Sequence, residues 1–188
     1  MVRLTFLGIM LSVSAALGGC IDQTATTEQH AKVNVSDVPQ FNSDGELLLP
    51  DNIDEWVLLG SSIGQRYEEV EFDSNSPGMF QVVQMEPTAY AEYKRTGEFP
   101  DGTMFALSFY TAETDVPPNQ AGFVMGESHG IEIHIRSSER FESGSGFFNF
   151  GMGDTGQLIP APNACIACHT EHAESDMVFT QFYPVLRN

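Results

Sequence analysis

A short cysteine and histidine run near the end of the chain constrains this protein more than any other feature. Residues 164–172 read ACIACHTEH, so Cys165, Cys168 and His169 form a C-x-x-C-H run. If this run opens a helix, the thiols at positions i and i+3 lie on one face. Both can then reach the two vinyl groups of one porphyrin, and the imidazole that follows can bind the iron. The run therefore predicts one covalently attached c-type haem, with His169 as the proximal iron ligand.

Two other interpretations start from the same cysteine pair. A C-x-x-C pair can be a redox dithiol or half of a structural zinc site. A zinc site needs a second pair of ligands, and the only other cysteine of the chain is Cys20, close to the N-terminus. A thioredoxin-like dithiol follows the first strand of an α/β unit rather than standing at the far end of a chain. Haem attachment is therefore the favoured interpretation.

The first 19 residues have the character of an export signal. Arg3 is the only charged residue among the first 21, and residues 4–16 form an apolar run too short to span a membrane as a mature helix. The LGGC run at residues 17–20 resembles the lipobox of bacterial lipoproteins, which implies cleavage before Cys20 and lipidation of that cysteine. We expect a signal peptide over residues 1–19 and a lipid-anchored protein of the bacterial cell envelope that faces the periplasm. A plain secretory signal with an incidental cysteine is the alternative.

The rest of the chain divides into a tether and one domain. Residues 20–45 are polar and poor in aromatic side chains, so we expect a flexible tether there. The haem domain is predicted over residues 46–188, which is long enough for one hydrophobic core. With Cys20 lipidated and the other two cysteines bound to haem, none remains for a disulfide.

The charge of the chain limits its partners. Acidic residues number 26 and basic residues 8. Such a chain cannot neutralise phosphates, which excludes a nucleic-acid partner, and it is not attracted to an anionic membrane surface. Membrane association is therefore expected through the lipid anchor only. The acidity serves solubility, or it attracts a cationic partner such as a basic redox cytochrome.

Six segments of the predicted domain are rich in β-forming residues. The segment 103–111 is nearly all apolar, as expected of a strand that is buried on both faces. Residues 128–130 separate two of the segments and are predicted to form a hairpin turn. In the segment after that turn, isoleucines alternate with polar residues, so His134 is predicted on a polar face. The predicted strands are residues 56–59, where Gly60 ends the strand, 80–85, 103–111, 122–127, 131–136 and 146–150.

Two helices accompany these strands. Residues 87–96 begin with a proline, carry two basic residues in the last turn and precede Gly97, a pattern typical of a helix with its start and stop signals. The second helix is predicted to begin near Ala164 and to carry the C-x-x-C-H run, after a loop over residues 154–163. The expected fold class is α+β, mainly β, with a C-terminal haem-binding helix.

The source of a sixth iron ligand is less evident. The only methionine after His169 is Met177, which is too close in sequence to wrap around to the opposite face of the ring. The nominal candidates in the body of the domain are Met104, Met125, Met152, His129 and His134. A buried methionine usually serves packing. We therefore expect an open or water-occupied sixth position.

Two stretches of the predicted domain resemble a known family. The ACIACH run at residues 164–169, together with DMVFTQFYP at residues 176–184, is similar to the C-terminal signature of the cytochrome P-460 family, which includes the β-sheet cytochromes c′. The FPDG run at residues 99–102, which enters an apolar strand, matches a second family feature. The resemblance covers most of residues 47–188.

The resemblance implies an antiparallel β-rich domain that holds one five-coordinate c-type haem. Cys165 and Cys168 match the thioether positions, and His169 matches the proximal ligand. Cytochromes P-460 proper carry an additional bond from a lysine to the porphyrin and oxidise hydroxylamine. The β-sheet cytochromes c′ lack that bond, have an apolar distal pocket and bind nitric oxide. The only lysines of this chain are Lys32 in the predicted tether and Lys94 on a predicted exposed helix, so the cross-link is not expected.

Three functions are compatible with these residues. The favoured one is an exported haem lipoprotein with five-coordinate iron that binds nitric oxide, with an apolar distal face from Phe105, Leu107 and Phe109. The second is a haem enzyme that oxidises hydroxylamine, for which a proton acceptor is needed; the nearby acidic residues are Glu113, Asp115, Glu127 and Glu132. The third is a one-electron carrier with six-coordinate iron. Compatible protein partners are a redox cytochrome and, in a homodimer, a second copy of this chain.

Overall fold

The computed structural model describes residues 39–66, 69–71 and 73–187. The chain divides into two units, Met1–Lys32 and Val33–Asn188, and all described residues belong to the second. The predicted signal peptide, Cys20, Lys32 and most of the predicted tether lie outside the described residues. No helix within the described ranges combines the length and the apolar character that crossing a membrane requires.

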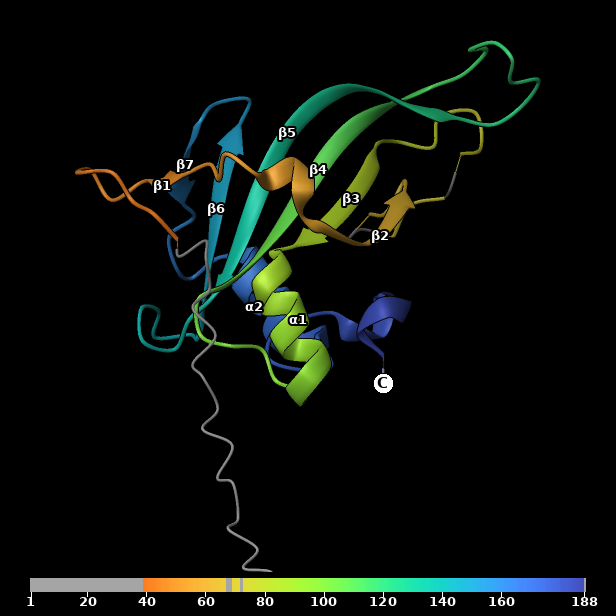
Figure 1. Ribbon diagram of the computed structural model, residues 1–188. Coiled ribbons are helices and arrows are strands. Elements are labelled where there is room, and N and C mark those ends of the chain that lie inside the picture. Colours follow the sequence, from red (N-terminus) through yellow and green to blue (C-terminus); the bar gives the residue numbers. More distant parts are fainter. Residues whose placement is uncertain (1–38, 67–68, 72, 188) are drawn as a thin grey trace, which may run out of the picture. The chain divides into compact units, whose positions relative to one another are not determined.

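The described residues form one antiparallel sheet in the order β1-β7-β6-β5-β4-β3-β2 (Figure 1). Strands β2 to β6 each pair with the next strand in the chain, so the sheet is a meander, and β1 joins its edge beside β7. The strands are β1 (Leu47–Leu48), β2 (Val57–Ile63), β3 (Phe80–Met85), β4 (Thr103–Glu113), β5 (Val124–Arg136), β6 (Ser145–Gly151) and β7 (Thr155–Leu158). The predicted α+β, mainly β class is confirmed.

Both predicted helices are present, α1 (Pro87–Thr96) and α2 (Ala164–His172). Three short 3-10 turns accompany them: η1 (Ile53–Glu55), η2 (Thr180–Phe182) and η3 (Pro184–Leu186). Helix α1 ends at Thr96 and is capped by Gly97, which adopts the left-handed conformation that glycine favours at a helix end. At its start the buried Glu86 side chain accepts hydrogen bonds from the backbone N–H groups of Thr88 (2.8 Å) and Ala89 (2.6 Å).

The two faces of the sheet are covered by different parts of the chain. Neighbouring residues of β4 enter opposite clusters, Met104 the first and Phe105 the second, which confirms that this strand is buried on both faces. The first core cluster contains Leu47, Trp56, Met104, Ala106, Ile133, Ile135, Phe148 and Phe150. The second core cluster contains Leu59, Met85, Ala89, Tyr93, Phe99, Phe105, Val178 and Leu186. Helix α1 and the C-terminal segment therefore cover the second face (Figure 1).

The predicted hairpin turn at residues 128–130 is wrong. These residues lie within β5, where Gly130 pairs with Phe109 and Ser128 pairs with Tyr110 across a register shift. The chain reverses earlier, between β4 and β5 at residues 114–123. Gly130 has a φ of 139°, and a Cβ atom there would lie 3.0 Å from the carbonyl oxygen of Gly151. The glycine therefore permits a strand irregularity and a close approach of β6, rather than a turn.

Three other boundaries differ from the predictions. Strand β2 continues through Gly60 as far as Ile63, with a register shift at that glycine. The predicted loop over residues 154–163 contains β7, which is held between β1 and β6 although its sequence, TGQL, is poor in β-forming residues. Ordered packing also begins upstream of residue 46, because Phe41 bridges to Leu47 and packs against the first core cluster.

We expect the substitution Glu86→Ala to destabilise the domain by about 1–3 kcal/mol, because it leaves two N–H groups at a buried helix start without acceptors. Urea denaturation of the haem-loaded protein measures this loss. The matched control is Glu98→Ala, at an exposed position just beyond the same helix, which should change stability by less than about 0.5 kcal/mol. Equal effects of the two substitutions would contradict the capping role.

Candidate haem site

Helix α2 presents the two cysteines of the C-x-x-C-H run on one side. The helix starts at Ala164 because the side chain of Asn163 accepts a hydrogen bond (2.8 Å) from the backbone N–H of Ile166. Cys165 and Cys168 are one helical turn apart, and both are free thiols of intermediate exposure. Burial, followed by the charge of Glu132, raises the pKa of Cys165.

His169 is oriented by a hydrogen bond to the backbone. Its Nδ1 lies 2.6 Å from the carbonyl oxygen of Met177. A carbonyl only accepts, so Nδ1 carries the hydrogen and donates, which leaves the lone pair on Nε2. Among the described residues, Nε2 has no hydrogen-bond partner. Burial lowers the pKa of His169, and the Met177 carbonyl opposes this effect only in part, so the imidazole is neutral and able to bind a metal.

The ring of His169 is surrounded by aromatic side chains. The ring centres of Phe179, Phe147 and His134 lie 4.6, 4.7 and 5.1 Å from its own centre. Phe179 comes from the segment after α2, whereas the other two come from β6 and β5. The imidazole is therefore clamped between the C-terminal segment and the sheet.

The sheet residues beneath His169 form a cross-strand row, which we call the first row: Met85, Phe105, His134 and Phe147, paired in that order across β3, β4, β5 and β6. All four side chains are buried. Alternate residues of a strand point to the same face, so two further rows follow on this face. The second row is Val83, Leu107, Glu132 and Asn149, and the third is Gln81, Phe109 and Gly130.

His134 does not lie on a polar strand face as predicted. It is only 9% exposed, and its ring stacks on Phe147 with a centre-to-centre distance of 4.5 Å. Its Nε2 lies 2.8 Å from the hydroxyl oxygen of Ser145. Burial, with smaller contributions from His169 and Arg136, lowers the pKa of His134 well below its ordinary value. Packing of α2 over this end of the sheet turns the predicted polar face into a buried one.

The second row is more open than the first. Val83, Leu107 and Glu132 are half-buried, and Asn149 is exposed. Burial raises the pKa of the Glu132 carboxyl. A cavity of ≈ 270 Å³ borders the second and third rows, and its lining includes Phe109, His129, Gly130, Glu132 and Asn149. The face therefore changes from buried beside His169 to half-open beyond it.

The family of the chain follows from a comparison with known families. The model of the family described as cytochrome P-460 matches residues 50–180, a range that contains β2 to β7, α1 and the whole of α2. The chain belongs to the cytochrome P-460 family. No curated protein matches the chain. Membership of this family identifies the protein as a haem-binding cytochrome, and the predicted family is confirmed.

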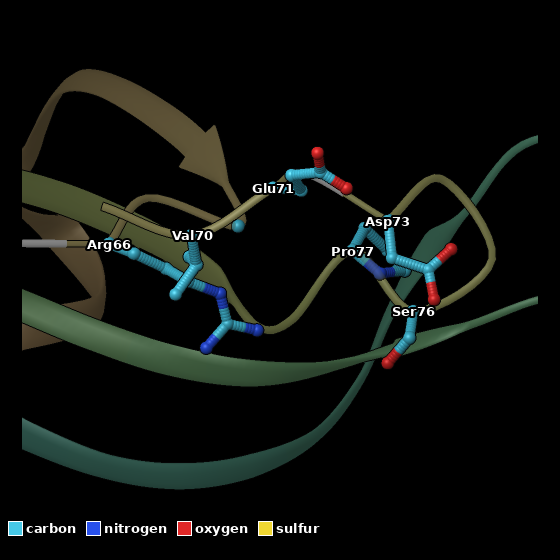
Figure 2. Close-up of a pocket in the computed structure, with 7 residues that line it drawn as sticks. Arg66, Val70, Glu71, Asp73, Ser76 and Pro77 are labelled. Carbon is cyan, nitrogen blue, oxygen red and sulfur yellow. The ribbon is translucent and has the colours of Figure 1, made fainter. Parts of the chain in front are cut away.

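The residues on this face suit the haem that the cytochrome P-460 family implies. Two thiols on one helix face and a neutral imidazole with an unpartnered Nε2 form the donor set that c-type attachment needs. Across the described part of the chain, no three side chains of histidine, cysteine, aspartate or glutamate gather to hold a metal ion. A larger cavity of ≈ 470 Å³ lies in the β2–β3 connection, but its lining, which includes Arg66, Glu71 and Asp73, contains neither cysteine nor histidine for c-type attachment (Figure 2).

The positions of some candidate sixth ligands in the cytochrome P-460 domain exclude them from binding the iron that His169 would hold. Met104 is buried in the first core cluster, on the opposite face of the sheet from His169. The ring of His134 contacts that of His169 edge to face, so no iron fits between them. Met125 and Met152 are 53% and 72% exposed, and His129 is exposed beside the cavity.

Of the acidic candidates, the structure brings Glu132 to the site. Glu113, Asp115 and Glu127 are exposed, whereas Glu132 is half-buried in the second row. The sequence contained a signal for this position: Glu132 alternates with the isoleucines of β5, which places it on the opposite face of the strand from them. Lys94 is exposed at the end of α1, where its Nζ donates a hydrogen bond (3.3 Å) to the carbonyl of Val185. It is thus engaged by the C-terminal segment and not by the three rows.

The raised pKa of Glu132 makes a prediction about stability. A carboxyl whose pKa is higher in the folded protein than in the unfolded chain takes up a proton on folding, so it reduces stability as the pH rises from its ordinary value of 4.5 through the folded-state pKa. We expect Glu132→Gln to gain stability relative to the parent protein over this window, with little difference at lower pH. Urea denaturation of the haem-loaded protein at a series of pH values measures it.

The matched control for this measurement is Glu127→Gln, an identical change at an exposed position of the same strand. A difference between Glu132→Gln and the parent protein that stays constant with pH would contradict the assignment.

Proposed function

We propose that this cytochrome P-460 domain holds one covalent c-type haem with five-coordinate iron, and that it binds small nitrogen-containing ligands such as nitric oxide. The observation that carries the proposal is the hydrogen bond from His169 Nδ1 to the Met177 carbonyl. It leaves Nε2 as the one ring nitrogen for a metal, one residue beyond a pair of thiols in helical register.

Each residue of the C-x-x-C-H run has a separate task in this proposal. Cys165 and Cys168 form the thioethers, and His169 supplies the axial nitrogen. The rings of His134, Phe147 and Phe179 restrict the rotation of that imidazole. When bound, the haem supplies an iron centre able to bind diatomic and other small nitrogen ligands.

The half-open part of the sheet face supplies the surroundings of the ligand. Val83, Leu107 and Phe109 present apolar side chains from two pairings of β3 and β4 on this face, Val83 with Leu107 and Gln81 with Phe109. Apolar surroundings disfavour charged ligands and favour neutral diatomics such as nitric oxide and carbon monoxide. No lysine occupies a described strand, so these rows also lack a donor for a lysine–porphyrin bond.

One observation favours a second candidate function, the oxidation of hydroxylamine. That reaction releases protons, and Glu132 is a half-buried carboxyl among the apolar residues of the second row. Because burial raises its pKa, its basicity is closer to what a proton acceptor needs near neutral pH than that of an exposed carboxylate. Glu132 would take the proton in this candidate.

The attachment is tested by pigment analysis. We expect the denatured parent protein to keep its haem through extraction with acidified organic solvent. The double substitution Cys165→Ala with Cys168→Ala should release it, and His169→Ala should incorporate little haem. The matched control is His172→Ala, an exposed histidine of the same helix with a side chain that is 60% exposed, which should behave as the parent protein does. Full haem and an unchanged spectrum in His169→Ala would contradict the ligand assignment.

The function is tested by spectroscopy and turnover. For the parent protein we expect a high-spin ferric EPR signal, nitric oxide binding to the ferrous form, and no turnover of hydroxylamine with an electron acceptor. If hydroxylamine is oxidised, the second candidate holds, and Glu132→Gln should slow turnover about 100-fold or more, whereas Glu127→Gln should not. A low-spin, six-coordinate ferric spectrum would contradict the open position and favour an electron carrier.

A further inference from the structure

The turn that supplies the Met177 carbonyl has an unusual backbone. Asp176 and Met177 are consecutive and have φ values of 50° and 59°. The N–H of Val178 donates to the carbonyl of Ser175 over 2.7 Å, so residues 175–178 form a β-turn whose two central residues have positive φ. Glycine and asparagine normally occupy such positions, and aspartate tolerates them, whereas methionine does not favour them. The conformation must therefore be imposed by its surroundings.

Two contacts hold this turn in place. Val178, at one end, is buried in the second core cluster with an exposure of 4%. At the tip, Nη2 of Arg136 lies 3.3 Å from a carboxylate oxygen of Asp176. Arg136 is the last residue of β5, and its side chain is only 23% exposed, so its position is restricted by packing. The ion pair thus ties the turn to the strand that also carries His134.

We propose that the ion pair between Arg136 and Asp176 is a positioning device that keeps the Met177 carbonyl on His169 and thereby strengthens the bond from His169 to the haem iron. A carbonyl that accepts from Nδ1 increases the electron density on Nε2, and outer partners of this kind tune metal ligands. The inference rests on the proposed role of His169 as the axial ligand. Arg136 and Asp176 act through the Met177 carbonyl and are not proposed to contact the haem or the small molecule that it binds.

The ion pair acts by geometry, which distinguishes it from a simple field effect. If the pair is broken, the turn can relax toward commoner backbone angles, and the carbonyl moves away from Nδ1. The resulting weakening of the bond from His169 to the iron has the same sign whichever partner of the ion pair is removed. A field effect of the lost charge on the iron would have opposite signs for Arg136 and Asp176, because one is positive and the other negative.

The experiment is resonance Raman spectroscopy of the ferrous, haem-loaded protein, which reports the iron–histidine stretching band. We expect the band to shift to lower wavenumber in both Arg136→Gln and Asp176→Asn, and to return close to the parent position in Arg136→Lys, which keeps the ion pair. Asparagine at position 176 tolerates positive φ, so that variant isolates the lost charge from the backbone preference.

The matched control is Arg140→Gln. Arg140 lies over the ring of Phe41, 3.5 Å from its centre, on the side of the first core cluster, so its loss should leave the band unchanged. An unchanged band in both Arg136→Gln and Asp176→Asn, or shifts in opposite directions, would overturn the inference. A parent protein without covalent haem or without an iron–histidine band would instead overturn the proposed function, so the two failures are distinguishable.

Discussion

The site depends on the hydrogen bond between His169 Nδ1 and the carbonyl of Met177. It selects the tautomer of the imidazole, leaves Nε2 without a hydrogen-bond partner among the described residues and ties α2 to the segment that follows it. Because that segment also buries Val178 and Leu186 against α1 and the sheet, the orientation of one ring is linked to the second core cluster. A change in the packing of the C-terminal turns therefore reaches the candidate iron ligand directly.

The sheet face next to α2 shows how one fold provides two environments. In the first row, Phe105, His134 and Phe147 are buried; His134 and Phe147 contact the ring of His169, and Phe105 stacks on His134. One step further along the same strands, the second row is half-buried and contains Glu132 beside Leu107. A five-coordinate haem site requires a rigid base and a more open neighbouring surface. The protein must hold its own axial ligand fixed on one side of the iron, and the other side must admit an exchangeable small ligand.

Several features of the fold could be predicted because their signals are local. The proline, the basic last turn and Gly97 mark α1, and the alternation of isoleucines marks one half of β5. The turn at residues 128–130 was predicted wrongly because a glycine that admits a neighbouring strand has the same sequence as a glycine that makes a turn. Strand β7 was missed because its pairing partners, not its composition, hold it in the sheet.

The sequence by itself determined which residues are proposed to hold the haem, since the proposed roles of Cys165, Cys168 and His169 depend on spacing within one helical turn. It also determined the family and the mainly β class, whereas the lipid anchor at Cys20 stays a prediction. Only the tertiary structure decided the surroundings of the donors. The burial of His134, the half-buried Glu132 and the strained turn at Asp176 and Met177 arise from contacts between residues distant in sequence, and no local pattern encodes such contacts.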